Sequence, residues 1–243
     1  MLTVDFDRFP VGMGDRVLDM GCGAGRHAFE LYRRGADVVA LDMDADELNG
    51  VAEMFEAMKA EGEAPLHAQA NAVRGNAYQL PFPDASFDRI VAAEVLEHLP
   101  EDSRAMAELT RVLRPGGMIA VSVPRWLPEK VCWALSDDYH EVEGGHVRVY
   151  KGDVLEKRLT ATGLEPVGQH HAHGLHSAYW WLKCAVGVTN DDNPLVKAYH
   201  RILVWDMMKA PAATRLAERA LNPVLGKSLV VYLRKPEVSY ANA

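Results

Sequence analysis

Three glycines at alternate positions follow a short apolar run near the start of the chain. The segment reads Asp19-Met-Gly21-Cys-Gly23-Ala-Gly25, and glycines allow a backbone turn to pass close to a ligand at the end of a strand. In the dinucleotide-binding fingerprint the third glycine would take the place that Arg26 occupies here. A carboxylate at Asp19 would repel a pyrophosphate and attract a cation. The loop therefore predicts a site for a positively charged ligand.

Histidines that could remove a proton from a substrate are concentrated in the second half of the chain. All five Trp and seven of the ten His lie between Trp126 and Trp205. His140 and His146 flank a Gly-Gly pair, which lets the backbone bend over a neighbouring site, and a histidine titrates near neutrality. We therefore predict His146 as a general base, with His140, Glu94 and His98 as the alternatives.

Four more histidines, His170, His171, His173 and His176, lie close together. In a strand, side-chain alternation would put His171 and His173 on one face and His170 on the other, so the four could not bind one metal ion without a break in the strand. We expect them to line a pocket or to support the fold. A hard ion such as Mg²⁺ would prefer carboxylate and substrate oxygens, and the sequence singles out no such ligands.

Short apolar runs alternate with helical patterns through the first half of the chain. We expect strands at 16–20, 37–42, 72–74, 87–93 and 118–123, and helices at 26–34, 45–61 and 103–113. Pro115-Gly-Gly117 is expected to break the chain between the last of these helices and the strand that follows. This alternation predicts a doubly wound α/β fold with a mostly parallel sheet covered on both faces. Asp42 ends the second strand, where acids in such folds accept hydrogen bonds from ribose hydroxyls.

The pattern changes after residue 124. A helix is expected at 153–162, a strand at 164–171 and a last strand at 228–234. The residues between these two strands, 177–227, are too many for a hairpin turn and carry helical patterns. We therefore expect a single domain over 1–243, with a cofactor-binding half at 1–124, acceptor-binding segments at 125–227 that include a helical insertion at 177–227, and a last strand at 228–235.

The composition is that of an ordinary globular protein, with 49% hydrophobic and 25% charged residues. A net charge of −8 opposes nonspecific binding of nucleic acid, so a small-molecule partner is expected. The three cysteines are few and widely spaced, the first residues contain no apolar leader, and no apolar run is long enough to span a bilayer. We therefore expect a cytoplasmic protein without a transmembrane segment. Homo-oligomerisation is left open.

Several motifs occur in a fixed order between Val11 and Pro124. They are Val17-Leu-Asp-Met-Gly-Cys-Gly-Ala-Gly25, Val39-Ala-Leu-Asp42, Gly75-Asn-Ala-Tyr-Gln-Leu-Pro-Phe-Pro83, Glu94-Val-Leu-Glu-His-Leu99 and Leu113-Arg-Pro-Gly-Gly117. Together they resemble the class I S-adenosylmethionine-dependent methyltransferases, in the subgroup of small-molecule and ubiquinone-pathway enzymes. The resemblance implies a Rossmann-like, seven-stranded sheet whose last strand is antiparallel to its neighbours, with a helical lid inserted between strands six and seven.

The resemblance also implies S-adenosylmethionine as the cofactor and a set of cofactor-binding residues. These are Asp19, Gly21, Cys22, Gly23, Gly25, Asp42, Met43, Asn76, Ala77 and Glu94. Asn76 occupies the position, commonly Asp in the family, that receives the adenine amino group.

An absent motif and a second, weaker resemblance together indicate the chemical class of the acceptor. After the fourth strand stands Ala93-Glu-Val-Leu96, in place of the Asn/Asp-Pro-Pro-aromatic motif of methyltransferases that act on nucleic-acid amines. The His-x5-His-Val-Arg-x-Tyr and Tyr-Trp-Trp-Leu-Lys stretches resemble actinobacterial methyltransferases, some of which act on sugar hydroxyls, including those of methylated mannose polysaccharides. We predict an O-methyltransferase for a small hydroxylated acceptor, expected to be a saccharide. The alternatives are a quinone or lipid-like acceptor, and a protein that binds the cofactor without catalysis.

Overall fold

The computed structural model describes residues 2–139, 145–209 and 211–237. Seven strands form one sheet in the order β3-β2-β1-β4-β5-β7-β6. Their bounds are Arg16–Met20 (β1), Asp37–Asp42 (β2), Ala70–Arg74 (β3), Phe87–Ala93 (β4), Leu113–Pro124 (β5), Glu165–Ala172 (β6) and Ser228–Arg234 (β7). β7 runs antiparallel to both β5 and β6, and the other pairs are parallel. This confirms the predicted doubly wound sheet with an antiparallel last strand.

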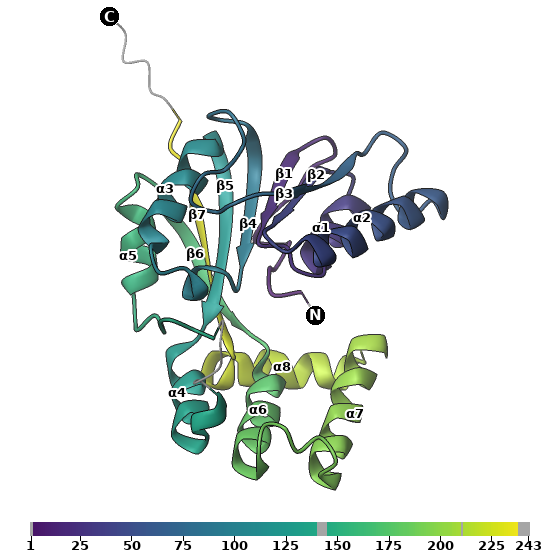
Figure 1. The fold of residues 1–243 in the computed structure, drawn as a ribbon, viewed down its shortest axis with the longest axis vertical. Coiled ribbons are helices and arrows are strands. Elements are labelled where there is room, and N and C mark those ends of the chain that lie inside the picture. The colour runs from purple at the N-terminus through teal and green to yellow at the C-terminus, as the bar shows by residue number, and fades with distance from the viewer. Residues whose placement is uncertain (1, 140–144, 210, 238–243) are drawn as a thin grey trace, which may run out of the picture.

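Helices cover both faces of the sheet (Figure 1). One core lies between the sheet and helices α1 (Arg26–Arg33) and α2 (Ala45–Ala60), and a second core includes helices α3 (Asp102–Val112) and α5 (Val154–Thr160). The central strand β4 is buried on both faces from Ile90 to Ala92, which explains why its sequence is apolar from Ile90 to Ala93. The strand order reverses between β1 and β4, and ligands of such folds bind where the strands end at this reversal.

A further group of helices lies beyond the carboxyl ends of the parallel strands, below the sheet in Figure 1. It consists of α4 (Trp126–Leu135), α6 (Gly174–Val186), α7 (Pro194–Lys209) and α8 (Ala212–Leu225). Three of these helices separate β6 from β7 in the chain, as predicted, whereas α4 was not expected. No helix in the described part of the chain is both long and apolar enough to cross a membrane.

Three sequence predictions need correction. β5 begins at Leu113, so the Pro-Gly-Gly segment lies within the strand rather than before it. Its extra residues are taken up by an irregularity in the pairing with β4, where Phe87 faces Leu113 but Arg89 already faces Met118. The helical insertion begins at Gly174, three residues earlier than expected, because the amide of Gly174 is held by the side chain of Asn222 on α8.

The third correction concerns the histidine cluster. β6 ends at Ala172, and His173 adopts a left-handed backbone conformation with φ of 65°. Strand alternation therefore does not apply to His173. Its ring lies 5.6 Å from that of His176, which stands on the first turn of α6. The break in the strand thus separates His173 and His176 from His170 and His171.

Candidate active site

The glycine loop leaves β1 in a conformation that only glycine adopts easily. Gly21, Gly23 and Gly25 have φ values of 71°, 48° and 78°. A Cβ atom at Gly21 would lie 2.4 Å from a methyl group of Val95, whereas one at Gly23 would meet nothing within 4 Å. The loop therefore packs tightly beneath the segment after β4 at one glycine and faces open space at the next.

A cavity of about 320 Å³ lies at this edge of the sheet. Six of the ten predicted cofactor-binding residues line it, namely Gly21, Gly23, Asp42, Met43, Ala77 and Glu94. They come from the ends of β1, β2 and β4 and from the segment after β3. The other four, Asp19, Cys22, Gly25 and Asn76, do not line this cavity.

Asp42 joins the second strand to the glycine loop. Its Oδ2 accepts a hydrogen bond of 2.8 Å from the Gly23 amide, and its Oδ1 accepts bonds from the amides of Met43 and Asp44. A carboxylate has about four acceptor sites, so capacity remains for ribose hydroxyls. The residue thus braces the loop and faces the cavity at the same time.

Asp19 lies behind the loop, with 1% of its surface exposed. Its side chain accepts a hydrogen bond from the Ala28 amide in α1, but its Oδ2 is buried with no partner among the described residues. Burial raises the pKa of Asp19 to about 7, against the lowering effect of that amide and of Arg26. A carboxyl group in this state gains most from a cationic ligand. The unpartnered oxygen and the open space at Gly23 both fit S-adenosylmethionine, which carries positive charge.

The remaining three predicted residues have structural tasks. Gly25 is the residue before α1, and a Cβ there would collide with the ring of Phe29. Cys22 is half-buried, with its thiol 3.5 Å from the Gly23 carbonyl oxygen. Asn76 is exposed, and its Oδ1 accepts a hydrogen bond from the Tyr78 amide. An adenine amino group would have to compete for that oxygen.

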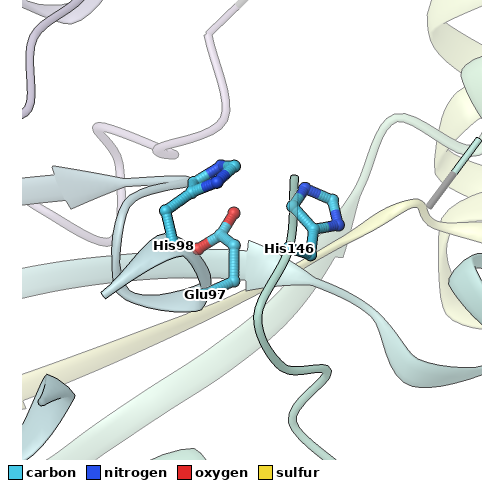
Figure 2. A group of neighbouring side chains, drawn as sticks. All are labelled: Glu97, His98 and His146. Carbon is cyan, nitrogen blue, oxygen red and sulfur yellow. The ribbon is translucent and has the colours of Figure 1, made fainter. Parts of the chain in front are cut away.

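A cluster of acids and histidines borders the cavity where β4 ends. Glu94 and His98 line the cavity, and the His146 ring lies 4.9 Å from that of His98. Figure 2 shows the Glu97 carboxylate between the two imidazoles. Glu97 is fully buried, and burial raises its pKa well above the ordinary value, with a further contribution from Glu94. His140 lies outside the described residues.

His146 is held by a residue that the sequence did not indicate. Its Nδ1 lies 2.6 Å from an oxygen of Glu129, on α4, whose side chain also receives hydrogen bonds from Trp133 and Tyr139. Glu129 is 1% exposed. Burial raises its pKa, but the contacts with His146 and Lys227 outweigh burial and lower it. The pair thus has the histidine–carboxylate arrangement that orients an imidazole for proton transfer.

A second cavity of about 350 Å³ shares Glu94 with the first. Its other lining residues include Arg26, His173, His176 and Lys227. Burial lowers the pKa of His176 to about 4 and also lowers that of His173 well below its ordinary value, so both are neutral at physiological pH. A second cavity thus lies directly beside the predicted cofactor site and is lined in part by residues of the helical insertion.

The chain is similar in sequence to proteins of known activity. Residues 18–121 match the family model described as a methyltransferase domain. Over these residues the chain is similar to methyltransferase domains. It is 33% identical over 158 residues to the 27-O-demethylrifamycin SV methyltransferase of Amycolatopsis mediterranei, covering 65% of this chain and 56% of that protein. It is 32% identical over 143 residues to a sterol 24-C-methyltransferase of Eremothecium gossypii, covering 58% of this chain and 34% of that protein.

A solved structure extends the likeness over nearly the whole chain. A SAM-dependent methyltransferase from Methanosarcina mazei superimposes with a TM-score of 0.61 at 17% identity, covering 97% of this chain and 100% of that one. The methyltransferase fold therefore includes the helical insertion as well as the sheet. The curated relatives agree with the chain over about half of their length or less.

Proposed function

We propose that the chain transfers a methyl group from S-adenosylmethionine to a hydroxyl group of a small acceptor. The observation that supports this most is the junction at Glu94, where the predicted cofactor cavity and the acceptor cavity meet beside an oriented histidine. The relative named for a 27-O-demethyl substrate supports oxygen as the methylated atom. We treat 1–243 as one working unit, with 1–124 binding the cofactor and 125–227 the acceptor.

Different residues of the chain bind the cofactor and remove the proton of the acceptor. The cofactor supplies a methyl group made electrophilic by its sulfonium. Gly23 and Asp42 hold the cofactor in the first cavity, while Glu94 forms the passage to the second. A hydroxyl is a weak nucleophile until its proton is removed. His146 takes that proton, and Glu129 keeps its imidazole in one orientation and stabilises the charged ring.

Substitution of His146 tests this assignment. His146→Gln should lower the rate of methyl transfer about 10²–10⁴-fold, the usual contribution of a general base, while leaving cofactor affinity within a factor of two or three. His67→Gln is the matched control, because His67 is an exposed residue that precedes β3 at the opposite edge of the sheet. Unchanged turnover of His146→Gln would show that another group removes the proton.

We propose a saccharide as the acceptor, because an aromatic side chain lies near the second cavity. Trp180 is half-buried on α6, and Lys227, which lines the cavity, has its ammonium 5.6 Å from the centre of the Trp180 ring. Such rings pack well against the apolar face of a sugar. A panel of free sugars and methyl glycosides, mannosides included, should contain an acceptor, and Trp180→Ala should raise its KM without affecting cofactor affinity.

A quinone or lipid-like acceptor is the second candidate, favoured by the surface of α7. Leu195, Ile202, Trp205 and Met208 are each about half exposed or more. Several exposed apolar side chains on one helix are typical of contact with another apolar surface. Binding to liposomes, together with methylation of quinols but not of sugars, would favour this acceptor over the saccharide.

A further inference from the structure

Glu97 is an unusual residue because its charge is buried without a partner. None of its surface is exposed, and neither carboxylate oxygen has a hydrogen-bond partner among the described residues. The carboxylates of Glu94 and Glu129 lie near enough to oppose its ionisation, and Lys227 offsets them only in part. Burial of an unpartnered carboxylate is costly unless the group is neutralised or faces a cation. The surroundings of Glu97 therefore call for a positive charge.

Two imidazoles face the same point as this carboxylate. One donor atom from each of Glu97, His98 and His146 lies within 4.8 Å of the other two. Figure 2 shows the three side chains converging from the turn after β4 and from the segment that precedes α5. Ligands at about 2.0–2.2 Å from a metal ion lie roughly 3–3.5 Å from one another in tetrahedral geometry. Small side-chain movements would thus bring all three donors into ligation.

The histidine that completes the group is already oriented as metal ligands are. The 2.6 Å contact of His146 Nδ1 with Glu129 fixes the proton on that nitrogen and leaves the Nε2 lone pair available. The backbone is fixed as well, since the amide of Val147 donates to the carbonyl oxygen of Glu97 at 3.0 Å. Three protein ligands with an oriented outer carboxylate are the pattern of a site with an open coordination position.

We propose that Glu97, His98 and His146 bind a divalent transition-metal ion at the edge of the cofactor cavity. Two nitrogens and one carboxylate suit Zn²⁺ or Mn²⁺ better than Mg²⁺ or Ca²⁺, which prefer oxygen ligands. The inference rests on the proposed function and refines it. A bound ion would occupy the Nε2 lone pair of His146 and would lower the pKa of an acceptor hydroxyl, whose proton would then pass to Glu94, the alternative base at the junction of the two cavities.

Metal binding can be measured without knowledge of the acceptor. The full chain, treated with a chelator, is titrated with Zn²⁺ and Mn²⁺ by calorimetry, and bound metal is counted by elemental analysis. We expect one equivalent per chain for the wild type and for His67→Gln. Glu97→Gln and His146→Gln should each lose at least about 100-fold in affinity.

Two results would overturn the proposal. One is a wild type that binds less than a tenth of an equivalent, or that binds equally well after Glu97→Gln and His146→Gln. The other is binding that is lost in His173→Gln but kept in Glu97→Gln, because the donor atoms of His173, His176 and Glu218 also lie within 4.8 Å of one another. Full methyl transfer by the metal-free wild type, combined with an inactive His146→Gln, would refute the role of the ion in the reaction and leave the proposed function standing. A wild type that binds metal but methylates no acceptor would contradict the proposed function alone.

Discussion

The buried carboxyl group of Asp19 predicts how cofactor affinity depends on pH. Burial raises the pKa of Asp19 to about 7 in the free protein, and a cationic ligand favours the ionised form. The protein must therefore release a proton to bind below this pKa. The ionised fraction rises from about one eleventh at pH 6 to about ten elevenths at pH 8. Affinity should rise about tenfold over the same range through this group.

Asp19→Asn isolates this effect. The amide keeps the shape and can still accept a hydrogen bond from the Ala28 amide, but it has no charge to titrate. At pH 8 the variant should bind more weakly by about 1.5–3 kcal/mol, the value of a hydrogen bond to a charged group. The assay is calorimetric titration with S-adenosylmethionine, in the absence of acceptor, at pH 6, 7 and 8, and the wild-type to variant affinity ratio removes the ligand's own titration. A ratio that stays constant with pH would refute the reasoning, and Asp153→Asn, an exposed change on the surface, serves as the control.

Three further outcomes follow from the structure. Gly21→Ala should destabilise the fold by about 1–3 kcal/mol in urea unfolding and weaken cofactor binding, because its Cβ would meet Val95 at 2.4 Å and φ is 71°; adding Val95→Ala should restore part of the stability. His27 accepts a hydrogen bond from the Thr3 amide, and burial lowers its pKa to about 3, so its contribution is complete above about pH 6.5 and is lost as the pH falls. Through His27 alone, unfolding at pH 5 should show a loss of about 2 kcal/mol relative to pH 8, and His27→Gln should reduce the measured pH difference by about that amount, while the shares of His173 and His176 remain. Ile90→Ala, at a fully buried position of β4, should cost about 2–5 kcal/mol, and a loss below 1 kcal/mol would show that the core closes around the vacant space.

The strands were predictable because their signal is local. β1, β2, β4 and β7 have the bounds expected from their apolar runs, or bounds within one residue of them. The start of β5 was not predictable, because Pro115-Gly-Gly117 has the composition of a turn. Only the pairing of Phe87 with Leu113 shows that the strand continues through this segment. Pairing between segments is a property of the folded sheet, so it cannot be predicted from the local composition of a turn.

The residues of the cofactor side could be predicted from the sequence, whereas those around His146 could not. Gly21, Gly23 and Asp42 act within a few residues of strand ends, so spacing alone indicated them. Glu129 could not be found, because it stands on α4 and reaches His146 across 17 positions of the sequence. Glu97 belongs to the Glu94–Leu99 motif that the sequence shows. Its importance, however, depends on its complete burial without a hydrogen-bond partner among the described residues. Contacts and burial of this kind appear only when the chain is folded.

The segment that carries His146 is held in place by an ion-pair network rather than by regular secondary structure. Asp102, at the start of α3, accepts a hydrogen bond of 2.6 Å from the Tyr150 hydroxyl and pairs with Arg148 at 3.1 Å and Arg158 at 2.5 Å. Burial raises the pKa of Asp102, but these three partners together lower it, so it stays ionised. Arg148 also donates to backbone carbonyls of the turn that carries Glu97 and His98. Because Arg148 contacts both Asp102 and the turn that carries Glu97 and His98, it connects the segment of His146 to the turn after β4.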